Sequence, residues 1–153
     1  MDEEHCNRLS YLAGYVDGEA CISLLRLDTL KFGIVSGDRE VLELMASTFG
    51  GSVDPEYREY QGRRHRYFRW RVNNAKAQEV LRRLLPFLIA KRQVAERACE
   101  LEFSPRRTTP EMLESRRKFK EFLSQSRHAR FLPSPEDTHP IHPRSIETSA
   151  QSG

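Results

Sequence analysis

The spacing of apolar residues changes several times along the first quarter of the chain. In residues 7–16 the apolar side chains recur every three or four positions, which predicts a short helix capped by Asn7 and ended by Gly18. Residues 21–27 and 30–35 have the length and apolar content of two strands joined by a turn. This part of the chain therefore predicts a helix followed by a hairpin.

The same unit is repeated in the following residues. A second helix is predicted between Ser36 and the terminating glycines at residues 50–51, and strands are predicted over residues 52–59 and 66–72. The last of these strands alternates cleanly, with one apolar face and one face of polar and cationic side chains formed by Tyr67, Arg69 and Arg71. We expect the apolar face to pack on a core.

Two further helical regions follow the second hairpin. A third helix begins at Asn74, Pro86 breaks it, and another helical segment continues to about Phe103. A basic helix is predicted from Thr109 to about residue 130. The expected fold class is thus α+β, with four antiparallel strands backed by helices on one face and open on the other.

The C-terminal residues differ in composition from the rest of the chain. Residues 131–153 hold four prolines, several Ser and Thr and few apolar side chains, so we expect a single domain over residues 1–130 and a disordered tail. No apolar run is long enough to cross a membrane, and the three cysteines form no close pair. We expect reduced thiols, no membrane partner and a cytoplasmic location, with an organelle left open.

The charge is distributed unevenly along the 153 residues. Residues 1–57 carry 4 basic and 11 acidic side chains, whereas residues 58–130 carry 20 basic and 8 acidic ones, a net charge of +12. Arginine accounts for 20 of the 25 basic residues, and its planar fork suits phosphate oxygens and guanine edges. A polyanionic partner is the leading expectation, and a solvated charged surface is the alternative that composition leaves open.

Residues 12–20 combine small residues with carboxylates at the end of the first helix. The small residues Ala13 and Gly14 permit close approach of another helix. Asp17 and Glu19 follow at the end where the helix dipole disfavours a carboxylate unless a cation neutralises it, and oxygen ligands alone suit Mg²⁺. Both acids are candidate metal ligands, although Asp17 has the alternative of hydrogen bonding to backbone amides of a turn.

The stretch Leu-Ala-Gly-Tyr-Val-Asp-Gly-Glu-Ala at residues 12–20 resembles the motif of the LAGLIDADG homing endonucleases. The element order follows that family over residues 8–103, and residues 85–91 resemble its helix-breaking segment with a basic residue. The resemblance implies an αββαββα fold with a saddle-shaped sheet. It also implies that Glu19, the eighth residue of the motif, binds the metal and that Lys91 stabilises transition-state charge or positions water.

Two residues depart from the family pattern. Ser36 stands where the family often has a Gln at the end of the second strand, and Ala20 replaces the closing Gly of the motif. Ser36 is a candidate catalytic residue acting through a water, or it caps the second helix.

The function implied by the resemblance is a site-specific double-strand break in a long, roughly palindromic DNA target, with Mg²⁺ as cofactor. One motif per chain implies a homodimer whose two Glu19 carboxylates lie side by side. The expected dimer contacts lie on the first helix, at Leu9, Leu12, Ala13, Gly14 and Val16. Three alternatives stay open: an RNA maturase, a catalytically inactive DNA-binding protein, and a structural basic domain without a nucleic-acid partner.

Candidate DNA contacts follow from the predicted strand faces. Strand ribbons fit the major groove, where acids accept from cytosine amines and arginines bind guanine. The open-face candidates are Ser23, Lys31, Asp54, Glu56, Arg58, Tyr67, Arg69 and Arg71. Near the second hairpin turn, Arg63, Arg64 and Arg66 are candidate phosphate contacts.

Overall fold

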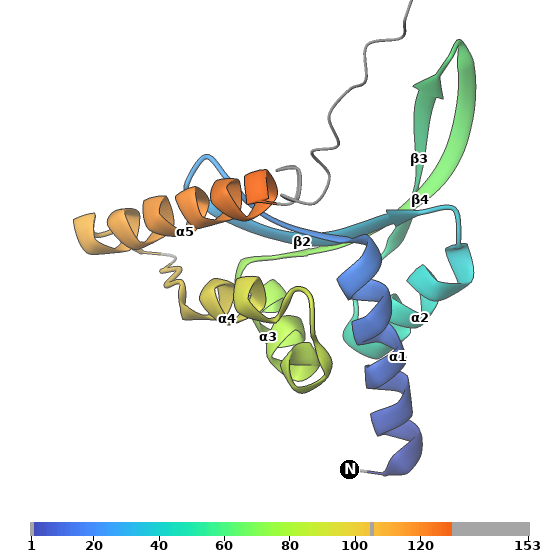
Figure 1. Ribbon diagram of the computed structural model, residues 1–153, viewed down its shortest axis with the longest axis horizontal. Helices are drawn as coiled ribbons and strands as arrows, with labels where there is room; N and C mark the ends of the chain where they lie inside the picture. The colour runs from blue at the N-terminus through green and yellow to red at the C-terminus, as the bar shows by residue number, and fades with distance from the viewer. Residues whose placement is uncertain (1, 105, 130–153) are drawn as a thin grey trace, which may run out of the picture.

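A computed structural model describes residues 2–104 and 106–129 of the chain. The tail predicted over residues 131–153 lies outside the described residues. The elements follow the predicted order, with a single 3₁₀ turn where Pro86 interrupts the third helix (Figure 1). They are α1 (Glu3–Glu19), β1 (Ala20–Leu25), β2 (Thr29–Ser36), α2 (Arg39–Phe49), β3 (Val53–Tyr60), β4 (Arg63–Asn73), α3 (Asn74–Leu84), η1 (Leu85–Phe87), α4 (Arg92–Glu100) and α5 (Pro110–Ala129).

The four strands form one antiparallel sheet in the order β1-β2-β4-β3. Gly33 of β2 pairs with Cys21 of β1 on one side and with Arg71 of β4 on the other. On the outer side of β4, Asp54 of β3 pairs with Arg69. Since side chains alternate along each strand, these residues share one face of the sheet, which confirms the α+β class and the predicted topology.

Helices α1 to α4 lie against the opposite face of the sheet (Figure 1). Trp70 is fully buried there and meets Phe32 edge-on, with ring centroids 5.6 Å apart. Its indole Nε1 donates a 2.9 Å hydrogen bond to the carbonyl of Gly50, the residue that ends α2. The buried polar atom of Trp70 is therefore satisfied, and α2 is fixed to the sheet.

The last helix, α5, packs beside β1 and α4. Its inward side chains fall at helical spacing, and Thr109 Oγ1 accepts a hydrogen bond from the backbone N–H of Met112 at its start. Arg116 is buried and donates to the carbonyls of Leu27 and Glu102, which joins α5 to the β1–β2 turn. No helix in the described part of the chain is long and apolar enough to cross a membrane.

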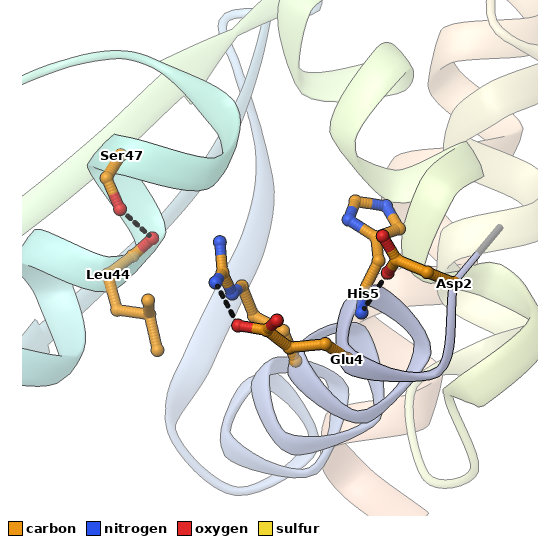
Figure 2. A network of polar contacts seen from close by, with 6 residues as sticks. Asp2, Glu4, His5, Leu44 and Ser47 are labelled. Carbon is orange, nitrogen blue, oxygen red and sulfur yellow. Dashed lines mark hydrogen bonds and ion pairs between the residues drawn. The ribbon is translucent and has the colours of Figure 1, made fainter.

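The first helix is longer than the spacing of its apolar residues predicted. It begins at Glu3 because Asp2 caps it, with Asp2 Oδ1 accepting a 2.8 Å hydrogen bond from the backbone N–H of His5 (Figure 2). Asn7 therefore lies inside the helix, and Gly18 does not end it. The expected cap and stop were wrong, since a better cap lies upstream and a glycine near a helix end does not have to terminate it.

Other boundaries differ from the prediction as well, and β4 begins at Arg63 instead of Arg66. The first strand stops at Leu25 because Arg26 and Leu27 adopt positive φ angles of 50° and 59° and form the turn. The helical segment predicted to reach Phe103 ends at Glu100. The turn was expected two residues later because neither Arg26 nor Leu27 carries the composition of a hairpin turn.

Candidate functional site

The open face of the sheet holds a hollow of about 360 Å³, here called the sheet hollow. Its floor lies on the central strands, and Gly33 has no side chain to fill it. A Cβ at Gly33 would lie 2.8 Å from the carbonyl oxygen of Trp70, so the close pairing of β2 and β4 requires glycine here. The polar and charged residues around the sheet hollow are Glu19, Cys21, Ser23, Lys31, Arg58, Arg69 and Arg71.

Glu19 is the last residue of α1, and its side chain is exposed at the sheet hollow. The following residue, Ala20, is extended and buried, so the chain passes directly from the helix into the edge strand. This step at the helix end brings the carboxylate to the open face, although α1 itself lies on the other side of the sheet. The last turn of α1 has no basic residue of its own.

Asp17 is bound to a segment distant in sequence. Its two carboxylate oxygens accept hydrogen bonds from the backbone N–H groups of Ile89, at 2.8 Å, and Lys91, at 2.9 Å. Partial burial raises the pKa of Asp17, but these bonds, one from Ala90 and the charge of Lys91 outweigh it and hold the pKa below its usual value. Asp17 thus has the geometry expected of a residue that hydrogen-bonds to the backbone amides of a turn. Metal binding by Asp17 stays a prediction.

Lys91 also binds to the end of α1. The side chain is only 8% exposed, and its Nζ donates a 2.5 Å hydrogen bond to the carbonyl of Asp17. Lys91 is therefore not a solvated surface lysine, and its ammonium neutralises the negative end of the helix dipole. Lys91 lines a separate pocket of about 150 Å³ beside α5, and Cys21 borders both this pocket and the sheet hollow.

Ser36 lies on the helix-covered side of the sheet, opposite the sheet hollow. It pairs with Phe68, and its hydroxyl forms a 2.5 Å hydrogen bond with Tyr15 of α1. The Ser36 Oγ also accepts from the N–H of Asp38, the residue that caps α2, so Ser36 stabilises the turn before α2 without capping it. The structure does not bring Ser36 to the sheet hollow, and the residue at the N-cap of α2 is Asp38 instead of the predicted Ser36.

The strand faces predicted for the DNA candidates are confirmed for most of the set. Register and burial put Ser23, Lys31, Asp54, Glu56, Arg58, Arg63, Tyr67, Arg69 and Arg71 on the open face. Arg64 and Arg66 pair with Glu59 and Tyr57, so they lie on the other face of the β3–β4 hairpin. The hairpin projects beyond the helices (Figure 1). The register of β3 and β4 puts arginines on both of its faces.

Aromatic rings order several of these arginines. The Arg64 guanidinium lies 4.1 Å from the ring centroid of Tyr57, and that of Arg66 lies 5.1 Å from the centroid of Phe68. Arg39 of α2 approaches the same Phe68 ring at 5.5 Å. Arg39 could not be selected from the sequence, because nothing in its local pattern indicates that α2 and β4 meet at this point.

The expected dimer contacts require a correction. Leu9, Leu12, Ala13 and Val16 are all buried in the core of their own chain, so they are not available to a second copy. Only Gly14 of the predicted set is exposed. The helical spacing of these residues identified the inward face of α1, whereas the outward face carries Tyr11, Gly14 and Gly18.

Solved structures share this architecture at low sequence identity. One is the homing endonuclease I-CvuI in complex with a DNA target in the presence of Mg, with the DNA not cleaved. Its sequence identity is 17%, the match covers 80% of this chain and 98% of that chain, and the TM-score is 0.51. Another is the archaeal intron-encoded homing endonuclease I-Vdi141I complexed with DNA, at 19% identity over 81% and 86%, with a TM-score of 0.53. The chain has the homing endonuclease fold. No family model matches the sequence, and no curated protein does either.

Within the homing endonuclease fold, the two segments that carry the resemblance lie together. The stretch at residues 12–20 forms the end of α1, and the segment at residues 85–91 forms the break between α3 and α4. The Asp17 and Lys91 hydrogen bonds join them. The sequence resemblance is thus confirmed at the level of the fold.

No cluster of three or more His, Cys, Asp or Glu side chains capable of holding a metal occurs among the described residues. The carboxylate exposed at the sheet hollow is that of Glu19.

Proposed function

We propose that the protein is a site-specific DNA endonuclease that acts as a homodimer and requires a divalent metal. The observation that carries this proposal is the exposed carboxylate of Glu19 at a hollow bordered by three arginines, in a chain with the homing endonuclease fold. A carboxylate beside a cationic surface suits an enzyme that binds a polyanion and hydrolyses it.

Recognition of the DNA is assigned to the open face of the sheet. A strand ribbon of this width enters the major groove of a duplex, where arginine forks bind guanine and phosphate. Arg58, Arg69 and Arg71 lie on this face near Glu19. The projecting β3–β4 hairpin, with arginines on both faces, extends the same cationic surface along the duplex.

The donor atoms at Glu19 fit a hard cation. The carboxylate is exposed at the carbonyl end of a helix, and oxygen is the only donor type that Mg²⁺ prefers. Glu19 of each copy and a DNA phosphate would hold the ion, since this chain offers no other exposed carboxylate at the sheet hollow among its described residues. The bound metal would activate water and polarise the scissile phosphate. Asp17 and Lys91 position Glu19 by fixing the end of α1.

A second copy is required because one chain supplies one such carboxylate, and a double-strand break needs two cuts. The outward face of α1 supports pairing there: a Cβ at Gly14 or Gly18 would meet nothing within 4 Å, and Tyr11 is 54% exposed. Pairing about a twofold axis through this face would bring the two helix ends together, and a roughly palindromic target would match the symmetry.

The test is cleavage of a plasmid that carries the intron-free insertion site, with Mg²⁺ or with EDTA. We expect linear product with Mg²⁺ from the wild type and from Glu40→Gln, an exposed acid on α2 that serves as control. Glu19→Gln should bind the DNA without cutting it. Tight binding without cleavage by the wild type would favour an inactive DNA-binding protein or an RNA maturase instead.

A further inference from the structure

Glu56 lies on the open face of β3 between two arginines. Its Oε1 accepts a 3.0 Å hydrogen bond from Nε of Arg58, and its Oε2 lies 3.2 Å from Nη1 of Arg69 on the neighbouring strand. One carboxylate thus links two cations from β3 and β4. Its side chain is only 21% exposed, compared with 56% for Arg58 and 39% for Arg69.

The carboxylate of Glu56 is poorly placed to contact a base. Oε2 is buried, and although it is within ion-pair distance of Arg69, the contact does not have the alignment of a hydrogen bond. Oε1 is already engaged by Arg58. The expectation that Glu56 accepts a hydrogen bond from a cytosine amine therefore conflicts with its contacts, which are directed at its own chain.

The two arginines are held at one end and exposed at the other. Arg69 contacts Glu56 through Nη1 and has a buried Nε, while its side chain as a whole stays 39% exposed. Arg58 is fixed twice, by Glu56 and by the Tyr67 ring, whose centroid lies 5.7 Å from the guanidinium. A guanidinium must keep a fixed plane to bind a guanine edge through two bonds.

We propose that Glu56 is a positioning residue for base recognition, which holds Arg58 and Arg69 in the orientation that reads bases. Its negative charge also disfavours a DNA phosphate next to these arginines. The arginines therefore contact the bases and not the phosphate backbone of the DNA. This inference rests on the proposed DNA-binding function and adds to it the residue that determines specificity at this part of the surface.

Asp54 provides a matched control. It lies two residues earlier on the same strand and face, directly opposite Arg69, yet its carboxylate accepts from the Ser52 hydroxyl at 3.3 Å and forms no ion pair among the described residues. Asp54→Asn removes the same charge from the same face as Glu56→Gln. Because Asp54 is itself a candidate base contact, a difference between the two variants reports the contacts of Glu56 with the arginines only at a base position that an arginine variant also loses.

The experiment is selection of bound duplexes from a randomised DNA library by the wild type, Glu56→Gln, Asp54→Asn, Arg58→Ala, Arg69→Ala, and the double variant Glu56→Gln/Arg69→Ala. We expect Glu56→Gln to lose about tenfold discrimination at a base position that Arg69→Ala also loses. The double variant should be no worse at that position than Arg69→Ala. On a non-specific duplex, the affinity of Glu56→Gln should fall more steeply with salt concentration than that of the wild type. The increase in slope should correspond to about one additional phosphate contact.

Two results would overturn the inference while leaving the proposed function intact. In one, Glu56→Gln loses preference at a position that neither arginine controls, which would make Glu56 itself the base-contacting group. In the other, Glu56→Gln selects the wild-type sequence with unchanged discrimination. A wild-type protein that selects no sequence would refute the proposed function as well. Thermal unfolding of each variant verifies that the fold is retained.

Discussion

Asparagine in place of Asp17 tests how the end of α1 is held. Both oxygens of Asp17 accept backbone hydrogen bonds from the segment that leads into α4. Asparagine keeps one acceptor oxygen and turns an NH₂ group toward the second N–H, so one charge-assisted bond is lost and the other is weakened. Such bonds contribute about 1.5–3 kcal/mol each, and because Asp17 is partly open to water we expect Asp17→Asn to lower the free energy of unfolding by about 2 kcal/mol.

The effect of Asp17→Asn depends on pH in a defined direction. Partial burial raises the pKa of Asp17, but hydrogen bonds from backbone amides and the charge of Lys91 bring the folded-state pKa below its ordinary value of 3.8. A lowered folded-state pKa means that the stabilisation is fully present above the ordinary pKa and is lost as the pH falls through the folded-state value. The difference in stability between wild type and variant should therefore be largest at neutral pH and shrink in acid.

Urea unfolding followed by circular dichroism, at about pH 7 and about pH 3, measures both effects. Asp38→Asn is the control, because Asp38 caps α2 without a side-chain hydrogen bond and asparagine serves equally well there. Equal losses for the two variants at neutral pH would refute the reasoning. A loss for Asp17→Asn that stays constant in acid would contradict the role assigned to the charge.

Four further substitutions test other parts of the structure. Gly33→Ala should destabilise the protein by about 1–3 kcal/mol in thermal unfolding, because its Cβ would clash with the backbone oxygen of Trp70. Gly14→Leu should keep the fold but yield a monomer in sedimentation equilibrium, at concentrations at which we expect the wild type to form a dimer. Arg63→Ala should weaken binding to all duplexes alike, and the slope of log affinity against log salt concentration should become shallower by about one. Arg69→Ala should instead relax the preference at one base position.

The order of the elements and the faces of the strands could be predicted from the sequence because they depend on local periodicity. Alternation in β4 separated Trp70 from Arg69 and Arg71, and the break at Pro86 fell where the composition indicated. The residues at which helices and strands begin and end were less predictable. Asp2 extended α1 upstream, and the turn after β1 uses positive φ angles at Arg26 and Leu27, which local composition does not signal.

Contacts between distant segments could not be predicted from spacing. The hydrogen bonds of Asp17 to residues 89–91 span more than seventy positions, and only the packing of α1 against the α3–α4 break brings them together. The same limit affected the first helix: helical spacing identified Leu12 and Val16 as one face, but not which partner that face packs against. The link between Glu56 and Arg69 likewise depends on the register of β3 and β4, which a single strand pattern does not reveal.

We expect two copies of Glu19 together to form the site that cuts DNA. Co-expression of wild type and Glu19→Gln in known ratios tests this arrangement, with plasmid linearisation measured with Mg²⁺ at constant total protein. If both carboxylates are needed, the rate of linearisation falls with the square of the wild-type fraction, and Glu19→Gln alone produces no linear DNA. A rate that falls in simple proportion to the wild-type fraction, or linearisation by Glu19→Gln alone, would contradict the account.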